Sequence, residues 1–207
     1  DWKLGDIVDS SPISVGAPAH FFDFNDYSDF KAAHANRDEV IYLGANDGMI
    51  HCFRTEDGAE KWAYIPKNQL GKLRELMDPS YCHDFFVNLT PKVTDAFVNG
   101  SWKTILICGQ KEGGDGYTAL DVTSPEPGSV SVLWDTTVPI VNESWSVPCI
   151  VRDRHLDKFI MVVGSGPDST THRAYAAAVD LANGSTLWTD LLSTSSGINM
   201  ANSAQAI

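Results

Sequence analysis

Apolar residues along this chain gather in short runs that polar or glycine-rich turns interrupt. The runs are rich in Val, Ile, Leu and aromatic residues, as at Ile105–Cys108 and Phe159–Val163. Runs of this length between Gly, Asp and Asn turns predict β-strands. Because they are almost continuously apolar and do not alternate, we expect sheets that are covered on both faces.

Three segments of the chain share one pattern, which indicates an internal repeat. In each, an apolar run ends in glycine, a polar turn leads to a second apolar strand, and a third strand carries a tryptophan. The segments are Glu39–Ile65, Lys103–Val138 and Lys158–Leu192, the glycines are Gly44, Gly109 and Gly164, and the tryptophans are Trp62, Trp134 and Trp188. The Asn46-Asp47-Gly48 step of the first segment is a strong signal for a hairpin turn.

A further strand precedes each segment and begins at a proline. The steps are Ser11-Pro12, Thr90-Pro91 and Val147-Pro148. Proline has no backbone N–H, so it belongs at the start or the edge of a strand. Four antiparallel strands in each repeat, with a tryptophan at a fixed place, are typical of β-propeller blades.

We therefore predict an all-β fold: a partial, open β-propeller of about three four-stranded blades with quinoprotein-like repeats. The predicted blades cover residues 7–66, 88–139 and 145–192 of a single domain, 1–207, and residues 202–207 would begin a fourth blade. Three blades cannot close a ring, because closed propellers have about four to eight. The end faces should expose apolar surface. The tryptophans should fill the widening gap between blades toward the rim.

Two insertions interrupt the repeats, and each predicts a short helix. In Phe21–Arg37 the helical spacing is carried by Tyr27, Phe30, Ala33 and His34. In Asn68–Met77, Asn68 can cap a helix whose apolar stripe is Leu70, Leu73, Leu76 and Met77, and Asp78-Pro79 ends it. We expect both insertions to decorate the face or the rim of the propeller between blades.

The net charge and the lack of a long apolar run argue against some classes of partner, namely nucleic acid and membranes. The formal net charge is −12, from 15 basic and 27 acidic residues. Such a surface repels nucleic acid and anionic lipid. No apolar run approaches the roughly 18 residues of a membrane span. Since the chain starts at Asp1 and lacks a signal peptide, we interpret it as a piece of a longer protein.

The four cysteines leave two interpretations open. They are Cys52, Cys82, Cys108 and Cys149, and none forms a CxxC pair. A zinc ribbon or a thioredoxin-type motif is therefore not indicated. An even number of cysteines would suit disulfides in an oxidising compartment, whereas buried thiols would serve as small hydrophobic residues.

The candidate ligand and catalytic groups are weak. The densest oxygen cluster lacks the glycine and the glutamate of a calcium loop, which favours an acidic helix-capping segment; its members are Asp23, Asn25, Asp26 and Asp29. The Gly109–Gly116 segment is not a phosphate-binding loop and predicts a β-turn. No HxH or HExxH pair occurs among His20, His34, His51, His83, His155 and His172, which we expect to pack or to bond to the backbone. We predict no catalytic, cofactor-binding or metal-ligating residue and no enzymatic activity.

Several motifs resemble one family in the same order along the chain. The string YLGANDGMIHCF (Tyr42–Phe53) resembles a strand and hairpin in the C-terminal propeller of PilY-type proteins, factors of bacterial type IV pili. The spacing of Phe30, His34-Ala35 and Arg37 also matches, as do Lys3–Pro12, Trp62–Pro66, Asp78–Val93, Asn99–Gly109 and Gly116–Pro125. The resemblance runs from about residue 2 to about residue 192.

The resemblance implies a non-enzymatic factor that assembles type IV pili, counters their retraction and adheres to surfaces through protein contacts. Its partners would be minor pilins, the pilus machinery, a host or abiotic surface, and the rest of its own propeller. It would be exported to the periplasm or outer membrane, the cell surface or the pilus tip. The family also has a calcium loop, expected in the parent protein just beyond Ile207, so no metal ligand is carried onto this chain.

Two other functions share the blade repeat. One is a periplasmic scaffold of the outer-membrane assembly type, which has no chemistry. The other is a quinoprotein dehydrogenase, whose cofactor lies beside two adjacent cysteines, and no two cysteines are adjacent here. The hairpin at Asn46-Asp47-Gly48 and the two insertions favour the pilus family over a plain scaffold.

Overall fold

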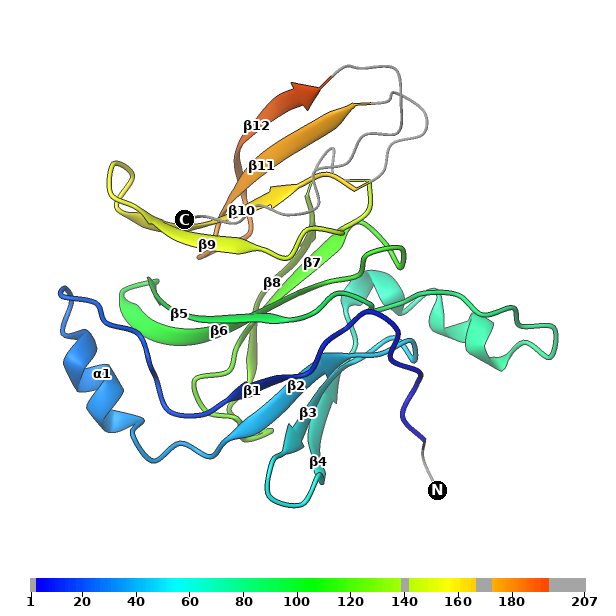
Figure 1. Ribbon diagram of the computed structural model, residues 1–207, viewed down its shortest axis with the longest axis horizontal. Helices are drawn as coiled ribbons and strands as arrows, with labels where there is room; N and C mark the ends of the chain where they lie inside the picture. The colour runs from blue at the N-terminus through cyan, green and yellow to red at the C-terminus, as the bar shows by residue number, and fades with distance from the viewer. Residues whose placement is uncertain (1–2, 139–141, 167–172, 194–207) are drawn as a thin grey trace.

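Three four-stranded antiparallel sheets make up the described part of the chain, as the computed structural model shows (Figure 1). The structure describes residues 3–138, 142–166 and 173–193. In each sheet the strands lie side by side in chain order. The prediction of an open all-β arc of three four-stranded blades is confirmed.

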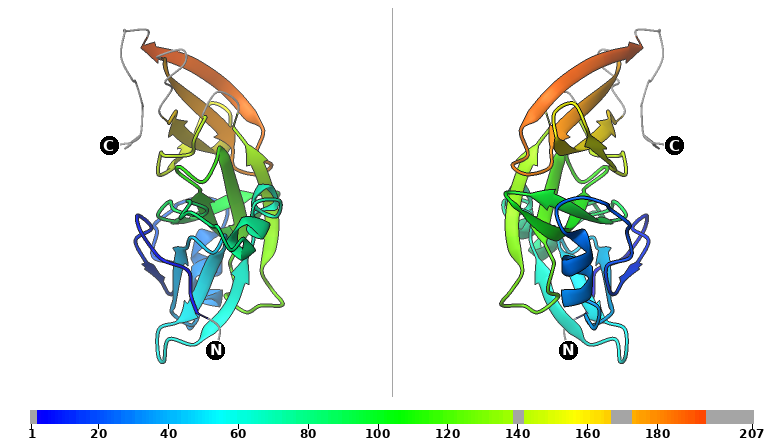
Figure 2. Two further views of the ribbon diagram at one scale, coloured as in Figure 1. Left: turned by 90° about the vertical axis from the view of Figure 1, so that its right-hand side faces the viewer. Right: turned by 90° about the vertical axis from the view of Figure 1, so that its left-hand side faces the viewer.

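Each sheet is one blade. Blade 1 contains β1 (Ile13–Val15), β2 (Val40–Gly44), β3 (Ile50–Arg54) and β4 (Glu60–Tyr64). Blade 2 contains β5 (Lys92–Val98), β6 (Ser101–Gly109), β7 (Gly116–Asp121) and β8 (Ser131–Thr137). Blade 3 contains β9 (Cys149–Asp153), β10 (Lys158–Gly164), β11 (Ala174–Asp180) and β12 (Thr186–Ser193). The blades are stacked with blade 2 in the middle (Figures 1 and 2).

The predicted start of each first strand is confirmed. The strands β1, β5 and β9 begin directly after Pro12, Pro91 and Pro148. The Asn46-Asp47-Gly48 hairpin is also confirmed, because it joins β2 to β3 and Gly48 has a φ of 90°. That left-handed conformation costs a glycine little. Residues 202–207, where a fourth blade is predicted to begin, lie outside the described residues.

Two apolar cores fill the gaps between neighbouring blades. Between blades 1 and 2, Tyr42 and Cys52 pack with Leu106 and Leu120. Between blades 2 and 3, Ile105 and Ile107 pack with side chains of β10 and β11, namely Phe159, Met161, Val163, Ala177 and Val179. Consecutive residues of β6 thus enter opposite cores, which explains its continuous apolar run. Full burial of one such side chain contributes about 1.5–3 kcal/mol.

The first insertion folds as predicted but lies elsewhere. It contains one helix, α1 (Tyr27–Ala33), with Tyr27 buried. The prediction that it lies between blades is wrong, because it joins β1 to β2 inside blade 1. It is also more than a decoration, since Tyr27 and Phe30 pack with the core between blades 2 and 3.

The second insertion does join two blades, but it is not the predicted helix. It forms two 3₁₀ turns, η1 (Lys67–Gln69) and η2 (Leu73–Met77). Gly71 stands between them, and a glycine in a helix interior is unfavourable by about 1 kcal/mol. Only half of the predicted stripe is covered: Leu73 and Leu76 are half-buried, whereas Leu70 and Met77 are 57% and 79% exposed. Without fuller packing, a short amphipathic helix gains little.

The cap prediction for Asn68 is also wrong. The Asn68 amide donates to Gln110 Oε1 at 2.9 Å, and the Gln110 amide donates back to Asn68 Oδ1 at 2.6 Å. The side chain therefore links the second insertion to the β6–β7 turn. The predicted end of this insertion at Asp78-Pro79 is confirmed, because η2 stops at Met77.

Residues 85–89 thread past the turns of blades 1 and 2, where two glycines give them room. A Cβ on Gly44 would lie 2.5 Å from the carbonyl oxygen of Val87, and one on Gly113 would lie 1.8 Å from that of Phe86. Real Cβ atoms do not approach backbone this closely. These two positions therefore require glycine because of space.

We expect Gly113→Ala to lower the free energy of unfolding by about 3 kcal/mol or more, because the new methyl group must displace backbone in a packed region. The measurement is urea unfolding followed by circular dichroism. Gly128→Ala is the matched control, since nothing lies within 4 Å of its Cβ position; it should change stability by less than about 0.5 kcal/mol. Equal effects of the two substitutions would contradict this account.

Candidate functional site

The three repeated tryptophans occupy equivalent places on the outermost strands of their blades. Trp62 lies opposite Cys52 in blade 1, and Trp134 lies opposite Ala119 in blade 2. Trp188 lies opposite Ala178 in blade 3. Because opposite residues of an antiparallel pair share a face, each indole lies on the face that leads toward the next blade.

In the first two blades the next blade supplies an acceptor for the indole. Trp62 Nε1 donates to the carbonyl oxygen of Pro125 at 3.0 Å, and Trp134 Nε1 donates to that of Leu181 at 2.8 Å. Both carbonyls lie where the third strand of the next blade turns toward its outermost strand. The predicted place of these two tryptophans, between blades near the rim, is confirmed.

Backbone atoms of blade 3 form the surface on which the Trp134 ring packs. Gly184 has a φ of 74°, and a Cβ there would lie 2.9 Å from the Trp134 ring. The Leu-Ala-Asn-Gly turn thus offers a carbonyl and a flat surface without a side chain. Trp134 is only 6% exposed as a result.

Trp188 has the same position but lacks such a packing surface in the described part of the chain. Its side chain is 44% exposed, and within the described residues its indole N–H has no hydrogen-bond acceptor. Leu191 and Leu192 on the same strand are 42% and 56% exposed. We call these three residues the β12 surface. Large apolar side chains that are exposed on an outermost strand are a candidate protein–protein contact.

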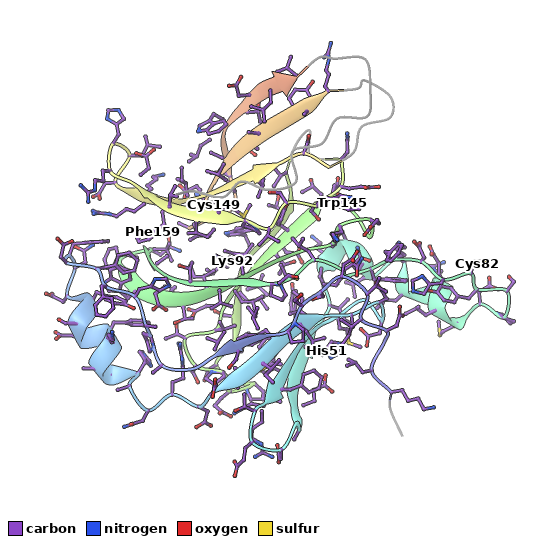
Figure 3. All side chains as sticks on the ribbon, viewed as in Figure 1. His51, Cys82, Lys92, Trp145, Cys149 and Phe159 are labelled. Atoms are coloured by element: carbon purple, nitrogen blue, oxygen red, sulfur yellow. The ribbon has the colours of Figure 1, made fainter. Side chains whose placement is uncertain are left out.

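Blade 1 carries a different group on the face that points away from blade 2. His51 is 1% exposed and lies between two carboxylates. Its Nε2 is 3.1 Å from Asp47 Oδ1 and its Nδ1 is 2.6 Å from Glu60 Oε1. Burial alone would lower the pKa of His51, but the hydrogen bonds and charges of both carboxylates outweigh burial and raise it. Figure 3 shows His51 in blade 1.

Asp47 also ties the start of the described chain to this group. Its Oδ2 accepts from the backbone N–H of Gly5 at 2.9 Å, and its Oδ1 accepts from that of Met49 at 3.2 Å. Burial favours a higher pKa for Asp47, but His51 and these two N–H groups hold it below the ordinary value. The raised pKa of His51 and the lowered pKa of Asp47 both favour an ion pair between these two side chains.

The acidic segment before α1 forms a turn and gathers no ligand set. Asp26 is the N-cap residue of α1, but its side chain makes no capping hydrogen bond, which corrects the expected capping role. Asn25 and Asp26 have φ values of 49° and 53°. Among the described residues no group of three His, Cys, Asp or Glu side chains is placed to hold a metal ion.

The other candidates are also structural. Gly109–Gly116 forms the predicted turn between β6 and β7. The His20 ring stacks on Phe22 with centroids 5.6 Å apart, and the His34 ring packs against Phe30 in a tilted geometry at 4.7 Å. His83 meets Asp6 at 2.8 Å, so it and His51 pair with carboxylates where backbone or packing was expected. His155 is exposed in a turn, and His172 lies outside the described residues.

The thiols Cys52, Cys82 and Cys108 form no disulfide. Cys52 and Cys108 are buried in the core between blades 1 and 2. Burial raises the pKa of Cys52 to about 12 and raises that of Cys108 further, so both stay protonated and serve as small apolar side chains. Cys82 is exposed on the loop that extends farthest from the blades (Figure 3).

Neither the acceptors of the tryptophans nor the partners of His51 were predicted from the sequence. Backbone carbonyls have no sequence signature. The Asp47-x-x-x-His51 spacing could have suggested the ion pair, because the predicted hairpin brings the two residues together. Glu60 lies on the next strand, so its contact with His51 could be predicted only if the register of β3 and β4 were known.

Comparison with known proteins identifies the family. The family model of the PilY1 β-propeller domain matches residues 4–186. The chain belongs to the PilY1 β-propeller family. The type IV pilus biogenesis factor PilY1 of Pseudomonas aeruginosa strain UCBPP-PA14 is 38% identical over 195 residues, which are 87% of this chain and 16% of that protein. A PilY1 homolog of Xylella fastidiosa is 34% identical over 192 residues, again 87% of this chain and 16% of that protein.

A solved structure supports the same family. The crystal structure of the P. aeruginosa PilY1 C-terminal domain aligns with a TM-score of 0.74 and 30% identity, and it covers 92% of this chain and 39% of that domain. The chain thus spans well under half of that C-terminal domain. This membership favours the predicted pilus family over the two alternatives, a periplasmic scaffold and a quinoprotein dehydrogenase. None of the helices in the described residues has the length and apolar character to cross a bilayer.

We expect Trp134→Phe to lower the free energy of unfolding by about 1–2 kcal/mol, because the buried Leu181 carbonyl loses its donor. Trp188→Phe is the matched control, and in this chain it should change stability by less than about 0.5 kcal/mol. Equilibrium urea unfolding measures both. A loss at Trp188 as large as that at Trp134 would show that the β12 surface is already covered.

The His51 network should make stability depend on pH. Because the pKa of His51 is higher in the folded chain, its stabilisation is complete below about pH 6.5, the ordinary value, and falls as pH rises through the folded pKa. We expect the stability advantage of wild type over His51→Gln to shrink between pH 6 and pH 9. Urea midpoints across this range measure it. An advantage that stays constant would mean that His51 does not titrate there.

Proposed function

We propose that the chain forms part of the propeller of a non-enzymatic type IV pilus assembly factor that counters retraction and promotes adhesion. Its relatives are named as pilus biogenesis factors. Since the chain spans 16% of those relatives, the activity of the whole protein goes beyond this part. The proposed partners are minor pilins, the pilus machinery and a host or abiotic surface. The parent protein would be exported to the periplasm or outer membrane, the cell surface or the pilus tip.

The observation that supports a role through protein contacts is the β12 surface. Trp62 and Trp134 each donate to a carbonyl of the next blade, and Trp188 repeats their position without such a neighbour among the described residues. We propose that the occupant is the next four-stranded blade of the parent propeller. That blade would offer a carbonyl to the Trp188 indole and an apolar face to Leu192.

We further propose that calcium belongs to the parent protein beyond Ile207. The described residues do not fit such a site, because no cluster of three His, Cys, Asp or Glu side chains gathers among them. No step of the proposed function uses the metal through residues of this chain.

The pilus role is tested in a bacterium that carries the parent gene. Deleting the gene should remove surface pili, as counted by electron microscopy, and blocking retraction as well should restore them. Normal numbers of pili in the deletion strain would refute the assembly role.

The blade contact is tested separately with Trp188→Asp. In the full-length protein this charge would be buried against the next blade, so we expect a misfolded propeller and as few pili as in the deletion strain. In the isolated 207-residue chain the same substitution should leave the urea midpoint unchanged. If the full-length variant makes normal pili while the deletion strain makes none, the contact at Trp188 is wrong and the pilus role stands.

A further inference from the structure

The insertion between β1 and β2, residues 16–39, starts and ends in blade 1 but packs on the other two blades. Figure 1 shows it running along one side of the stack of blades and returning to β2. Phe22, Phe24 and Phe30 pack against the core that contains Trp102 of blade 2 and Phe159 of blade 3. In a stack of repeats each unit ordinarily contacts only its neighbours. This insertion adds contact between blades that are not neighbours.

Blade 2 holds the insertion by stacking and by hydrogen bonds. The Phe22 ring stacks on Trp102 with centroids 4.9 Å apart and planes at 24°. The Trp102 indole donates to the carbonyl oxygen of Asn25 at 2.7 Å. The Tyr27 hydroxyl donates to Asp95 Oδ2 at 2.6 Å, and Asp95 is 3% exposed.

The insertion returns to blade 1 past a second anchor, Arg37. Its Nη1 donates to Thr104 Oγ1 at 2.6 Å and to the carbonyl oxygen of Thr123 at 3.3 Å. Its Nε donates to the carbonyl oxygen of Gly16 at 2.7 Å. One guanidinium thus joins the two ends of the insertion and fixes both on blade 2.

Blade 3 meets the insertion at Phe24 and Phe22. The guanidinium of Arg152, on β9, lies 3.6 Å from the centroid of the Phe24 ring. Phe159, on β10, stacks on Phe24 at 6.3 Å and meets Phe22 edge-on at 5.7 Å. Figure 3 shows Phe159 on the side of the stack where α1 lies. A cation over an aromatic face and aromatic pairs of this geometry are both attractive.

The backbone between the two phenylalanines and α1 is bent to make these contacts. Asn25 and Asp26 are consecutive left-handed residues, with φ of 49° and 53°. Such conformations are unfavourable outside glycine, although Asn and Asp tolerate them best. The bend brings the Asn25 carbonyl to Trp102, so local strain is exchanged for an anchor on blade 2.

From these contacts we propose that the β1–β2 insertion is a clamp that couples blade 3 to blade 1 across blade 2. It fixes the angles between the three blades without ring closure. The open arc therefore holds its shape as one module and presents the β12 surface in a fixed orientation. The clamp does not depend on the proposed pilus function.

The test is hydrogen exchange, measured by mass spectrometry, on the 207-residue chain with Phe24→Ala. We expect amides of β9 and β10 to exchange roughly tenfold faster, because the variant loses a stacked pair and a cation contact. Amides of β2 and β3, in the same blade as the insertion, should change much less. Phe21→Ala is the matched control, since Phe21 is 92% exposed, and it should leave β9 and β10 unchanged.

Three results would overturn the clamp. One is faster exchange confined to the insertion itself, and another is an equal rise in all three blades, which would mean only a general loss of stability. The third is an equal effect of Phe21→Ala. If Phe24→Ala does not fold, Phe24→Leu keeps most of the volume and removes the ring, and the same pattern of exchange is expected from it.

Discussion

The middle blade of this protein has two apolar faces, and a single four-stranded sheet cannot cover either of them. The strand β6 makes the constraint visible, because Ile105 and Ile107 enter one core while Leu106 and Cys108 enter the other. The sheet is stable only when it lies between two neighbours. Stacking follows from this need, and the turns, glycines and tryptophans adjust the distance and angle at which neighbours meet.

The tryptophans show how directional contacts refine a packing that is otherwise non-directional. Apolar faces alone would allow blades to slide, since burial depends on area and little on orientation. An indole that must reach one carbonyl, as Trp134 reaches Leu181, permits only one alignment. Gly184 then sets the closest approach, because any side chain there would meet the ring. Position and spacing are therefore set at the rim, where the gap between blades is widest.

The sequence predicted the features that depend on local chemistry. Prolines marked strand starts, Asn46-Asp47-Gly48 marked a hairpin, and continuous apolar runs marked sheets covered on both sides. It failed where a segment's structure depends on distant partners. Leu70 and Met77 had the spacing of a buried stripe but no surface to cover, and Asn68 bonds to Gln110 and caps no helix. The acceptors at Pro125 and Leu181 are backbone atoms, so no residue type announced them.

The two ends of the stack differ in chemistry, and the difference has a physical consequence. On blade 1 the buried ring of His51 and two carboxylates occupy part of the end face, and their hydrogen bonds require partners in fixed positions. On blade 3 the strand β12 exposes large apolar side chains, Trp188, Leu191 and Leu192, beside the polar Thr186, Thr189 and Asp190. A second copy that stacked blade 3 on blade 1 would bring Leu192 and Trp188 toward the His51 network. Burying these charged groups is unfavourable unless every charge stays paired. The mismatch therefore disfavours end-to-end stacking of copies and favours a blade whose own turn supplies the missing carbonyl.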